Sequence, residues 1–438
     1  MSMNRSHALR ATRRDFLRQT SLCAAAAAIG GVHSQLSAAP SKSPNEKLNI
    51  GCVGTANQAT FSINNVAHEN IVGLCDIDDN FLHEASKRFP QAAKYNDFRK
   101  MLDEQKQIDA VIVATPDHIH APATLWALRL GKHVYCEKPL THSVYESRLL
   151  AETAAQMKVA TQMGTQIHAE NNYRRVVEII QAGTIGKVSE VHVWVGKGWG
   201  GGERPTETPA VPPNIHWDLW IGPAPSRPYH STYLPANWRR WWDFGQGTLG
   251  DMACHYMDLP FWALGLRHPT TVAAEGPPVH KETAPLGLIV RYQFPARGDN
   301  RPPVKLTWYD GNLTPKEVAG HPVPGAGVMF RGEKGDMFAD YGSYKLYPES
   351  QFKDFQPPPK SIPDSIGHHR EWLKACRDGS ATTCNFDYAG ALSEAVLLGN
   401  VAYRTGKTIE WDPRTLTAKN CSEAAAYIRR EYRPGWGI

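Results

Sequence analysis

Short apolar strands alternate with amphipathic helices through the first third of the chain, and this alternation constrains the fold more than any other feature. The predicted strands are Leu48–Val53, Ile71–Cys75, Ala110–Ala114, His133–Cys136 and Val159–Met163, and the predicted helices include Phe81–Phe89, Ala121–Leu130 and Val144–Met157. Strands that are joined through helices pair in parallel, with the helices packed on both faces of the sheet. We therefore predict an α/β fold that begins with a doubly wound parallel sheet over residues 46–165.

The pattern changes after Gly164, where strand-like runs follow one another without regular helices between them. These runs are Val188–Val195, Thr271–Ala274, Leu288–Phe294, Val304–Tyr309, Val328–Arg331 and Asp336–Asp340, and the predicted helices are Tyr173–Ala182, Asp251–Leu264, His368–Arg377 and Tyr388–Tyr403. Consecutive strands without crossover helices favour antiparallel pairing. We expect residues 166–438 to form an α+β domain with a large, mostly antiparallel open sheet.

The N-terminal 39 residues have the layout of a secretory signal. Paired arginines, Arg13 and Arg14, precede an Ala-rich apolar stretch, Leu22–Val32, and the small residues Ser37–Ala39 follow it. The arginine pair resembles the twin-arginine type of signal. No apolar run reaches the ~20 residues that span a bilayer. We expect a periplasmic protein without stable membrane insertion after removal of residues 1–39.

Composition and spacing exclude several other classes of protein. The net charge of +5 includes the signal, and no Lys/Arg stripe follows it, so we expect no nucleic-acid partner. There is no Cys-x-x-Cys pair, and neither His118 and His120 nor the His368–His369 pair has a matching ligand set, so we predict no metal site. Cys376 and Cys384 either form a disulfide in an oxidising compartment or stay free, and both outcomes remain open.

The turn after the first strand resembles a dinucleotide-binding fingerprint. Gly54 and Ala59 occupy the first and third positions of G-x-G-x-x-G/A, while Ala56 replaces the second glycine. Its methyl group either shifts the diphosphate or marks a changed use of the site. Asp76 ends the second strand, where a carboxylate hydrogen-bonds ribose hydroxyls and repels a 2′-phosphate. The pattern predicts NAD(H) rather than NADP(H), with the diphosphate at the helix N-terminus. The turn residues assigned to the cofactor are Gly54, Thr55, Ala56 and Asn57.

Two further segments resemble the Gfo/Idh/MocA family, which includes glucose–fructose oxidoreductase and inositol dehydrogenase. They are Ala-Thr-Pro-Asp-His-Ile-His at 114–120 and Cys-Glu-Lys-Pro-Leu at 136–140, and the likeness continues through residues 164–166, 185–188, 250–255 and 332–335. The resemblance implies a Rossmann domain followed by a substrate domain whose open sheet often forms the interface of a homo-oligomer. The further cofactor contacts that it implies are Thr115, Pro116, His118, His120, Glu137, Lys138 and Gln166.

The same resemblance implies the catalytic residues. In that family the lysine of Glu-Lys-Pro, here Lys138, reaches the substrate near the nicotinamide, and the bond before Pro139 is often cis. Asp251 and His255 match a second element, Asp-x-x-x-His, whose spacing places both on one helical face. Oxidising an alcohol requires a base for the hydroxyl proton, a role that suits His255. We expect Lys138 to stabilise the developing oxyanion and Asp251 to orient the imidazole or to bind the sugar.

A tryptophan-rich segment, residues 197–242, has two interpretations. Its five clustered tryptophans are Trp217, Trp220, Trp238, Trp241 and Trp242. Tryptophan rings stack on sugar rings, but they also build local cores beneath long loops. We expect Lys197, Trp238 and Arg239 to contact substrate.

The sequence as a whole predicts hydride transfer between a tightly bound NAD and a hydroxyl or keto group of a sugar or polyol. Tight binding is expected because a periplasm offers no free nicotinamide pool. One alternative is an NAD-dependent glycosidase that oxidises its substrate, eliminates the aglycone, adds water and reduces again. The other is a non-catalytic sugar- or nucleotide-binding protein, which the alanine at position 56 favours and Lys138, Asp251 and His255 oppose.

Overall fold

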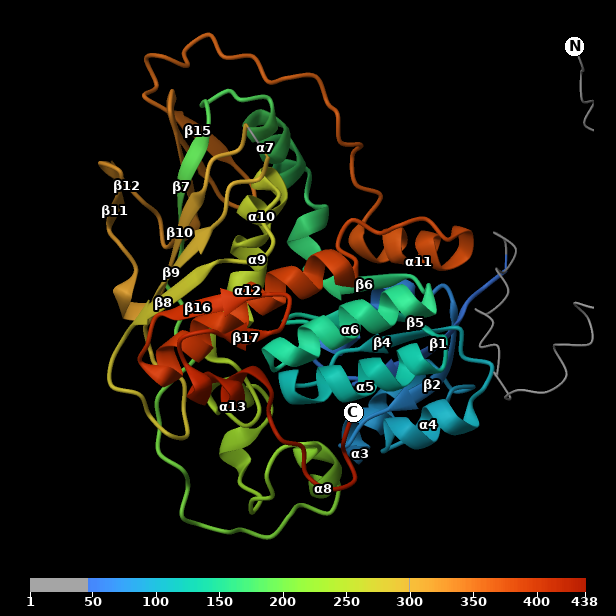
Figure 1. Cartoon of the computed structure of the whole chain (residues 1–438). Coiled ribbons are helices and arrows are strands. Elements are labelled where there is room, and N and C mark those ends of the chain that lie inside the picture. Colours follow the sequence, from blue (N-terminus) through green and yellow to red (C-terminus); the bar gives the residue numbers. More distant parts are fainter. Residues whose placement is uncertain (1–45, 299) are drawn as a thin grey trace, which may run out of the picture. The chain divides into compact units, whose positions relative to one another are not determined.

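The computed structural model describes residues 46–298 and 300–438. The N-terminal part of the fold is built around a parallel sheet of six strands (Figure 1). Its strands are β1 (Asn49–Val53), β2 (Asn70–Cys75), β3 (Ala93–Tyr95), β4 (Ala110–Val113), β5 (His133–Glu137) and β6 (Thr161–Gly164). Its helices are α2 (Gln58–Val66), α3 (Asp79–Arg88), α4 (Phe98–Glu104), α5 (Asp117–Arg129) and α6 (Val144–Met157). The predicted signal, residues 1–39, lies outside the described residues.

The sheet has the doubly wound strand order β3-β2-β1-β4-β5-β6 that the alternation predicts. All four residues of β4 are buried, as expected for a strand covered on both faces. The sequence analysis missed β3 and α4. Strand β3 lies at the sheet edge, and Lys94 on it is exposed, so it lacks the apolar run that identifies the other strands.

The second sheet has nine strands in the order β15-β14-β13-β7-β10-β9-β8-β16-β17. They are β7 (Val188–Val195), β8 (Thr271–Glu275), β9 (Ile289–Phe294), β10 (Val304–Asp310), β13 (Ala326–Gly332), β14 (Gly335–Ala339), β15 (Tyr344–Tyr347), β16 (Ile409–Asp412) and β17 (Thr417–Ala418). A separate hairpin pairs β11 (Glu317–Val318) with β12 (His321–Pro322). Neighbouring strands are antiparallel except β7 and β10, which pair in parallel. This sheet is therefore mixed and mostly antiparallel, which confirms the predicted fold class.

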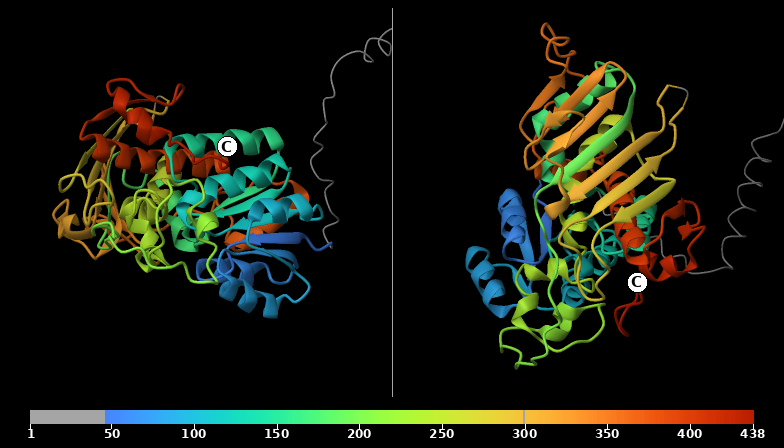
Figure 2. Two further views of the ribbon diagram at one scale, coloured as in Figure 1. Left: turned by 90° about the horizontal axis from the view of Figure 1, so that it is seen from below. Right: turned by 90° about the vertical axis from the view of Figure 1, so that its left-hand side faces the viewer.

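Helices cover one face of the second sheet, and Figure 2 shows the opposite face free of helices. The remaining helices are α7 (Asn171–Gln181), α8 (Trp217–Ile221), α9 (Gly247–Tyr256), α10 (Asp258–Leu264), α11 (His368–Asp378), α12 (Phe386–Thr405) and α13 (Ala425–Ile428). The single helix predicted at Asp251–Leu264 is two helices, α9 and α10, and α9 begins earlier. Pro260 has no amide hydrogen for Tyr256, so one continuous helix would lose a hydrogen bond there.

Helix α12 joins the two sheets, because it packs against α6 and β6 on one side and against α9 and β8 on the other. Small residues permit this close packing. A Cβ atom on Gly399 would lie 2.7 Å from the side chains of Leu249 and Tyr292, and one on Gly390 would lie 3.0 Å from the Ser147 carbonyl oxygen. The two sheets are therefore held by one shared buried helix.

All seven cysteines of the described residues are buried and free, including Cys376 and Cys384, so the possible disulfide is absent from this structure. Burial raises the pKa of the thiols of both residues. Among the helices of the described part of the chain, none is both long and apolar enough to cross a membrane.

The C-terminal segment is tied to the first sheet through a buried carboxylate. Glu146, in the first turn of α6, accepts hydrogen bonds from the backbone amides of His142 and Ser143 at 2.9 Å. It also accepts from Arg430 Nε at 2.8 Å and from the Tyr432 hydroxyl. The guanidinium of Arg430 donates further to the His118 carbonyl oxygen at 2.7 Å. The same carboxylate thus caps a helix and anchors the C-terminus.

Replacing Arg430 with Met should destabilise the protein, because Glu146 would keep a buried charge without its cation. Breaking such a pair costs about 3–5 kcal/mol. Urea unfolding followed by tryptophan fluorescence measures the loss. The matched control is Arg429→Met, since Arg429 is exposed and contacts only the Tyr145 ring, a contact of about 0.5–1 kcal/mol. Equal losses from the two variants would contradict the assignment.

Candidate active site

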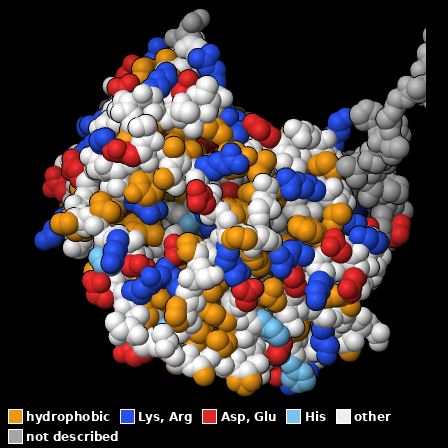
Figure 3. Space-filling model, turned by 60° about the horizontal axis from the view of Figure 1, so that its bottom comes forward, with side chains coloured by type: hydrophobic (Ala, Val, Ile, Leu, Met, Phe, Trp, Pro, Cys, Tyr) orange, Lys and Arg blue, Asp and Glu red, His pale blue; other side chains and the backbone are white. Residues whose placement is uncertain are grey.

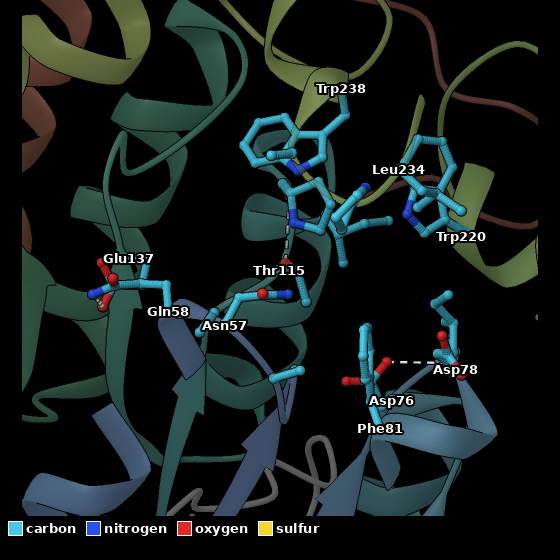
Figure 4. A pocket seen from close by; sticks show the side chains of 18 of the residues that line it. Asn57, Gln58, Asp76, Asp78, Phe81, Thr115, Glu137, Trp220, Leu234 and Trp238 are labelled. Carbon is cyan, nitrogen blue, oxygen red and sulfur yellow. Dashed lines mark hydrogen bonds between the residues drawn. The ribbon is translucent and has the colours of Figure 1, made fainter. Parts of the chain in front are cut away.

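One large pocket opens at the carboxyl ends of β1, β4 and β5, where the strand order of the parallel sheet reverses. Open α/β sheets bind ligands at this switch point. The cavity of about 1000 Å³ is at the upper end of the usual range for ligand sites. In Figure 4, Asn57 and Thr115 lie at its centre, with Asp76 and Asp78 to one side and Glu137 to the other.

The predicted fingerprint turn forms one wall of this pocket. Gly54 has φ of 91°, and a Cβ atom there would lie 2.4 Å from the Ala114 carbonyl oxygen, so only glycine fits. Ala59 is fully buried where α2 packs on the sheet. Asn57, just before α2, has φ of 54°, which asparagine tolerates better than most residues. The turn thereby places the N-terminus of α2 at the pocket, with Ala56 among the lining residues.

Asp76 occupies the predicted position at the end of β2. Its Oδ2 atom accepts hydrogen bonds from the Thr55 amide at 2.9 Å and from the Thr55 hydroxyl at 2.8 Å, and its Oδ1 atom accepts from the Asp78 amide at 3.0 Å (Figure 4). Burial raises the pKa of Asp76, and these hydrogen bonds oppose that effect. Since a carboxylate offers about four lone-pair sites, Oδ1 can still accept from a ribose hydroxyl.

The tryptophan-rich segment (residues 197–242) closes the same end of the pocket, which the sequence analysis did not predict. The Asp79 amide donates to the Asn214 carbonyl oxygen at 2.9 Å, and the His216 amide donates to the Ile77 carbonyl oxygen at the same distance. The Asn214 side chain donates to Asp78 at 2.8 Å. These bonds hold the segment against the β2–α3 connection.

Trp436, two residues before the C-terminus, lines this end as well. Its ring lies 4.2 Å from the Arg99 guanidinium carbon and packs against Phe98. Arg433 fastens the C-terminal segment to the tryptophan-rich segment through Asp218 and the Gly222 carbonyl oxygen. Nothing in the local sequence around residue 436 signals a pocket residue, because only the tertiary fold brings the C-terminus there.

The opposite end of the pocket brings together the three predicted catalytic residues. Lys138, at the end of β5, donates from Nζ to both the carbonyl oxygen and Oδ1 of Asp251, each at 2.7 Å. The Lys138–Pro139 peptide bond is cis, as the resemblance implies. His255 lies one turn after Asp251 on α9 and lines the pocket. The first sheet therefore supplies the lysine, and a helix of the second domain supplies the aspartate and histidine.

Asp251 also contacts two further cations. Arg239 donates from Nε to Oδ1 at 2.9 Å, and the Nζ atom of Lys197 lies 3.7 Å from Oδ2. Burial would raise the pKa of Asp251, but the charges of Lys138 and Arg239 outweigh burial and hold it below its usual range. Asp251 is therefore ionised at the centre of a cationic cluster.

His255 is a neutral base in this setting. Burial, with the charge of Lys138 acting in the same direction, lowers the pKa of His255 to about 3. Its Nδ1 atom is buried and has no hydrogen-bond partner among the described residues. Asp251, which was expected to orient the imidazole, bonds Lys138 and Arg239 instead. The imidazole is thus unprotonated near neutral pH, with its Nδ1 atom unoccupied by any hydrogen bond from the described residues.

The other predicted cofactor residues divide into two groups. Those that line the pocket are Thr115, Pro116, Glu137 and Gln166. His118 and His120 are not among its lining residues. His118 bonds the Trp220 carbonyl oxygen at 2.8 Å, and His120 bonds the carbonyl oxygens of Pro139 and Thr115 at 2.7 and 2.9 Å. These two histidines support the backbone around the site.

Most of the clustered tryptophans build a local core. Trp217, Trp220, Trp238 and Trp241 pack with Tyr233 and Phe244, and Trp242 joins the main core. Edges of Trp220 and Trp238 still reach the pocket, where Figure 4 shows both across from Thr115 and Asp76. The local-core interpretation therefore holds for most of the cluster, and stacking of tryptophan on a sugar stays a prediction. The sequence analysis missed Trp199, which lies 5.8 Å from Lys197 Nζ and 5.4 Å from the Arg239 guanidinium.

The sequence analysis also missed Asp117, at the start of α5. Its side chain is buried, and its electrostatic neighbours are Arg239, Lys138 and Asp251. Burial raises the pKa of Asp117 to about 8, so it is mostly protonated near neutral pH. It therefore adds little negative charge to the cationic cluster.

The pocket has a dinucleotide fingerprint at the switch point and a lysine, an aspartate and a histidine across from it. This combination defines the class of nucleotide-dependent oxidoreductases. The chain belongs to the Gfo/Idh/MocA family. Residues 48–165 match the model of the oxidoreductase family's NAD-binding Rossmann fold, and residues 171–296 match that of its C-terminal alpha/beta domain.

Curated relatives match part of the chain. Inositol 2-dehydrogenase of Salmonella paratyphi B is 28% identical over 147 residues, 33% of this chain and 43% of that protein. Levoglucosan dehydrogenase of Pseudarthrobacter phenanthrenivorans is 26% identical over 189 residues, 42% and 39% of the two chains. The matched stretch therefore spans less than half of these relatives.

Solved structures share the whole fold at low identity. GenD2 from gentamicin A biosynthesis, in complex with NAD, has a TM-score of 0.60 at 19% identity and covers 85% of this chain and 99% of its own. Levoglucosan dehydrogenase, in complex with NADH and levoglucosan, has a TM-score of 0.55 at 17% identity and covers 83% and 99%. These matches agree with the fold described above.

Lys138→Met should raise the pKa of His255 from about 3 toward its usual value. The variant removes a like charge from the imidazolium and leaves the attraction of Asp251 less compensated, and both changes favour protonation. We expect the pKa of His255 to rise by about one unit or more. NMR titration of labelled histidine rings measures this rise. Lys197→Met should shift His255 less, because Lys197 contributes less to its pKa. An unchanged pKa in Lys138→Met would refute the electrostatic coupling.

Proposed function

We propose that this chain is an NAD(H)-dependent oxidoreductase that transfers hydride between a nicotinamide and a hydroxyl or keto group of a sugar or polyol. The observation that carries the proposal is the position of Lys138, Asp251 and His255 beside a dinucleotide fingerprint in one continuous pocket. The names of the matched relatives, inositol 2-dehydrogenase and levoglucosan dehydrogenase, support this substrate class.

The residues of the pocket fit the cofactor. Gly54 allows close approach of the backbone, the amides at the α2 N-terminus suit a diphosphate, and Asp76 keeps an acceptor free for a ribose hydroxyl. Asp76, Asp78 and Asp97 are the charged residues that line the adenosine end, so a 2′-phosphate would meet carboxylates there and no cation among the described lining residues. This distribution of charge supports NAD(H) over NADP(H).

The proposed chemistry assigns one role to each residue. When bound, the nicotinamide supplies the hydride acceptor or donor. His255, held neutral by its surroundings, takes the hydroxyl proton as the alcohol is oxidised. Lys138 is fixed by two hydrogen bonds to Asp251 and keeps one ammonium hydrogen for the oxygen that becomes negative. Asp251 acts by positioning Lys138 and Arg239.

The enclosure of the adenosine end supports a cofactor that stays bound between turnovers. Residues 214–216 and Trp436 would have to move before a dinucleotide could leave. A retained cofactor must be recycled within the reaction, either by a second sugar or by the oxidation, elimination, hydration and reduction cycle of a glycosidase. Release of free sugar from a glycoside without net NADH distinguishes the glycosidase.

The purified protein should release close to one equivalent of NAD(H), and little NADP(H), on denaturation, as measured by mass and absorbance. Lys138→Met and His255→Gln should retain this nucleotide but lose turnover of sugar pairs by about 100-fold or more, the usual value of a positioned acid or base. Full activity in both variants would disprove the assigned roles. Nucleotide without turnover in the wild-type protein would favour a binding protein.

We also propose export through a twin-arginine signal, supported by Arg13 and Arg14 before the apolar stretch. Replacing both arginines with lysine should leave the protein in the cytoplasm, as fractionation and immunoblotting would show. A periplasmic variant would contradict the proposal.

The open face of the nine-stranded sheet is the proposed surface for a homo-oligomer.

No nucleic-acid partner is proposed, since basic and acidic side chains are interspersed on the face shown in Figure 3.

A further inference from the structure

The substrate end of the pocket carries more positive charge than the proposed hydride transfer requires. Three cations line it, Lys138, Lys197 and Arg239. Of these, Lys138 alone is placed to stabilise the reacting oxygen. The other two come from the tryptophan-rich segment: Arg239 shares Oδ1 of Asp251 with Lys138, and Lys197 lies beside Oδ2.

The negative groups nearby do not balance these charges. Asp251 contacts all three cations and compensates one. Glu137 is the last residue of β5, directly before Lys138, but its carboxylate accepts hydrogen bonds from Gln58, Ser62 and Gln166. Even if Glu137 compensates a second cation, one positive charge remains, because burial raises the pKa of the neighbouring Asp117 to about 8 and keeps it mostly protonated near neutral pH. His255 adds none while its imidazole is neutral.

The unused donors face the pocket. Lys197 has half of its side chain exposed (50%), and among the described residues its Nζ atom has no closer acceptor than Met252 Sδ and Asp251 Oδ2, both at 3.7 Å. Arg239 uses Nε for Asp251 and Nη1 for the Ala236 carbonyl oxygen, while Nη2 makes no hydrogen bond within the described residues. Trp238 lies 4.3 Å from the Arg239 guanidinium and keeps it in place. An ammonium and one guanidinium nitrogen are thus available side by side.

We propose that Lys197 and Arg239 form a subsite for an anionic group, so that the substrate is an acidic sugar bearing a carboxylate or a phosphate. Arginine and lysine together are suited to such a group, because the guanidinium offers directed donors and the ammonium offers a compact charge. The subsite rests on the proposed function, since it defines which sugars that same active site accepts. It also gives the tryptophan-rich segment a second role beyond closing the cofactor end.

The test uses the full mature protein with its bound nucleotide and matched sugars that differ in one charged group. The probes are glucose, glucuronate and glucose 6-phosphate, with the corresponding galactose and mannose series to allow for stereochemistry. Binding is followed by quenching of tryptophan fluorescence, since Trp199 and Trp238 lie beside the two cations. In at least one series the anion should bind about tenfold more tightly than the neutral sugar, and added salt should reduce this preference.

Lys197→Met should remove most of the preference for the anion, because it should weaken binding of the anion much more than binding of the neutral sugar. Arg239→Gln should reduce the same preference, so the proposal does not depend on one variant. The matched control is Lys305→Met, because Lys305 is equally exposed (47%) but lies on the open face of the second sheet, where it faces Glu190. That control should keep the full preference for the anion.

A preference for the uronate identifies a carboxylate ligand, and a preference for the sugar phosphate identifies a phosphate ligand. If no anion binds better than its neutral partner, including the case in which no sugar binds, the subsite is disproved. An equal loss of preference in Lys305→Met would also disprove it, because net charge would then explain the effect. Nucleotide content is measured separately, so failure of the subsite is distinguishable from failure of the proposed function.

Discussion

The contact between Lys138 and Asp251 is the interaction on which the candidate active site depends. Lys138 ends a strand of the parallel sheet, and Asp251 lies on α9 of the second domain, so the two bonds of 2.7 Å join chain segments 113 residues apart. The pair lies in a largely buried place, where breaking one partner is costly. Helix α12 packs against both α6 and α9, and this packing helps to hold the lysine and the aspartate together.

Around this contact the pocket is divided by charge. Carboxylates surround the end where β2 stops, and cations surround the end where β5 meets α9. The tryptophan-rich segment runs along both ends, with Asn214 and His216 bonded to the β2–α3 connection and Lys197 and Arg239 beside Asp251. The tryptophan-rich segment thus encloses the proposed cofactor and shapes the proposed substrate site. The aromatic core of this segment holds these distant groups in their positions.

Sequence reasoning succeeded where a local pattern has one physical cause. The glycine turn at Gly54 is required because a Cβ atom would strike Ala114, and the consecutive apolar residues of β4 reflect burial on both faces. It was less successful where the environment decides a role. His118 and His120 belong to a motif that suggested cofactor contacts, yet both rings form hydrogen bonds with backbone carbonyl oxygens. Trp436 carried no local signal, and Asp117 was part of a recognised motif without being assigned a role, since the surroundings of both come from distant parts of the chain.

The sequence by itself determined the alternation of strands and helices, the fingerprint turn, the acidic residue after β2 and the identity of the lysine, aspartate and histidine. The first three follow from periodicity and from local backbone geometry, which depend on neighbouring residues, whereas the resemblance to the Gfo/Idh/MocA family implied the lysine, aspartate and histidine. Only the tertiary structure decided that Asp251 serves Lys138, Arg239 and Lys197 together, that His255 is neutral, and that the C-terminus helps to close the pocket. The physical reason is that burial and electrostatic coupling depend on distances between residues far apart in the chain, and folding alone sets those distances.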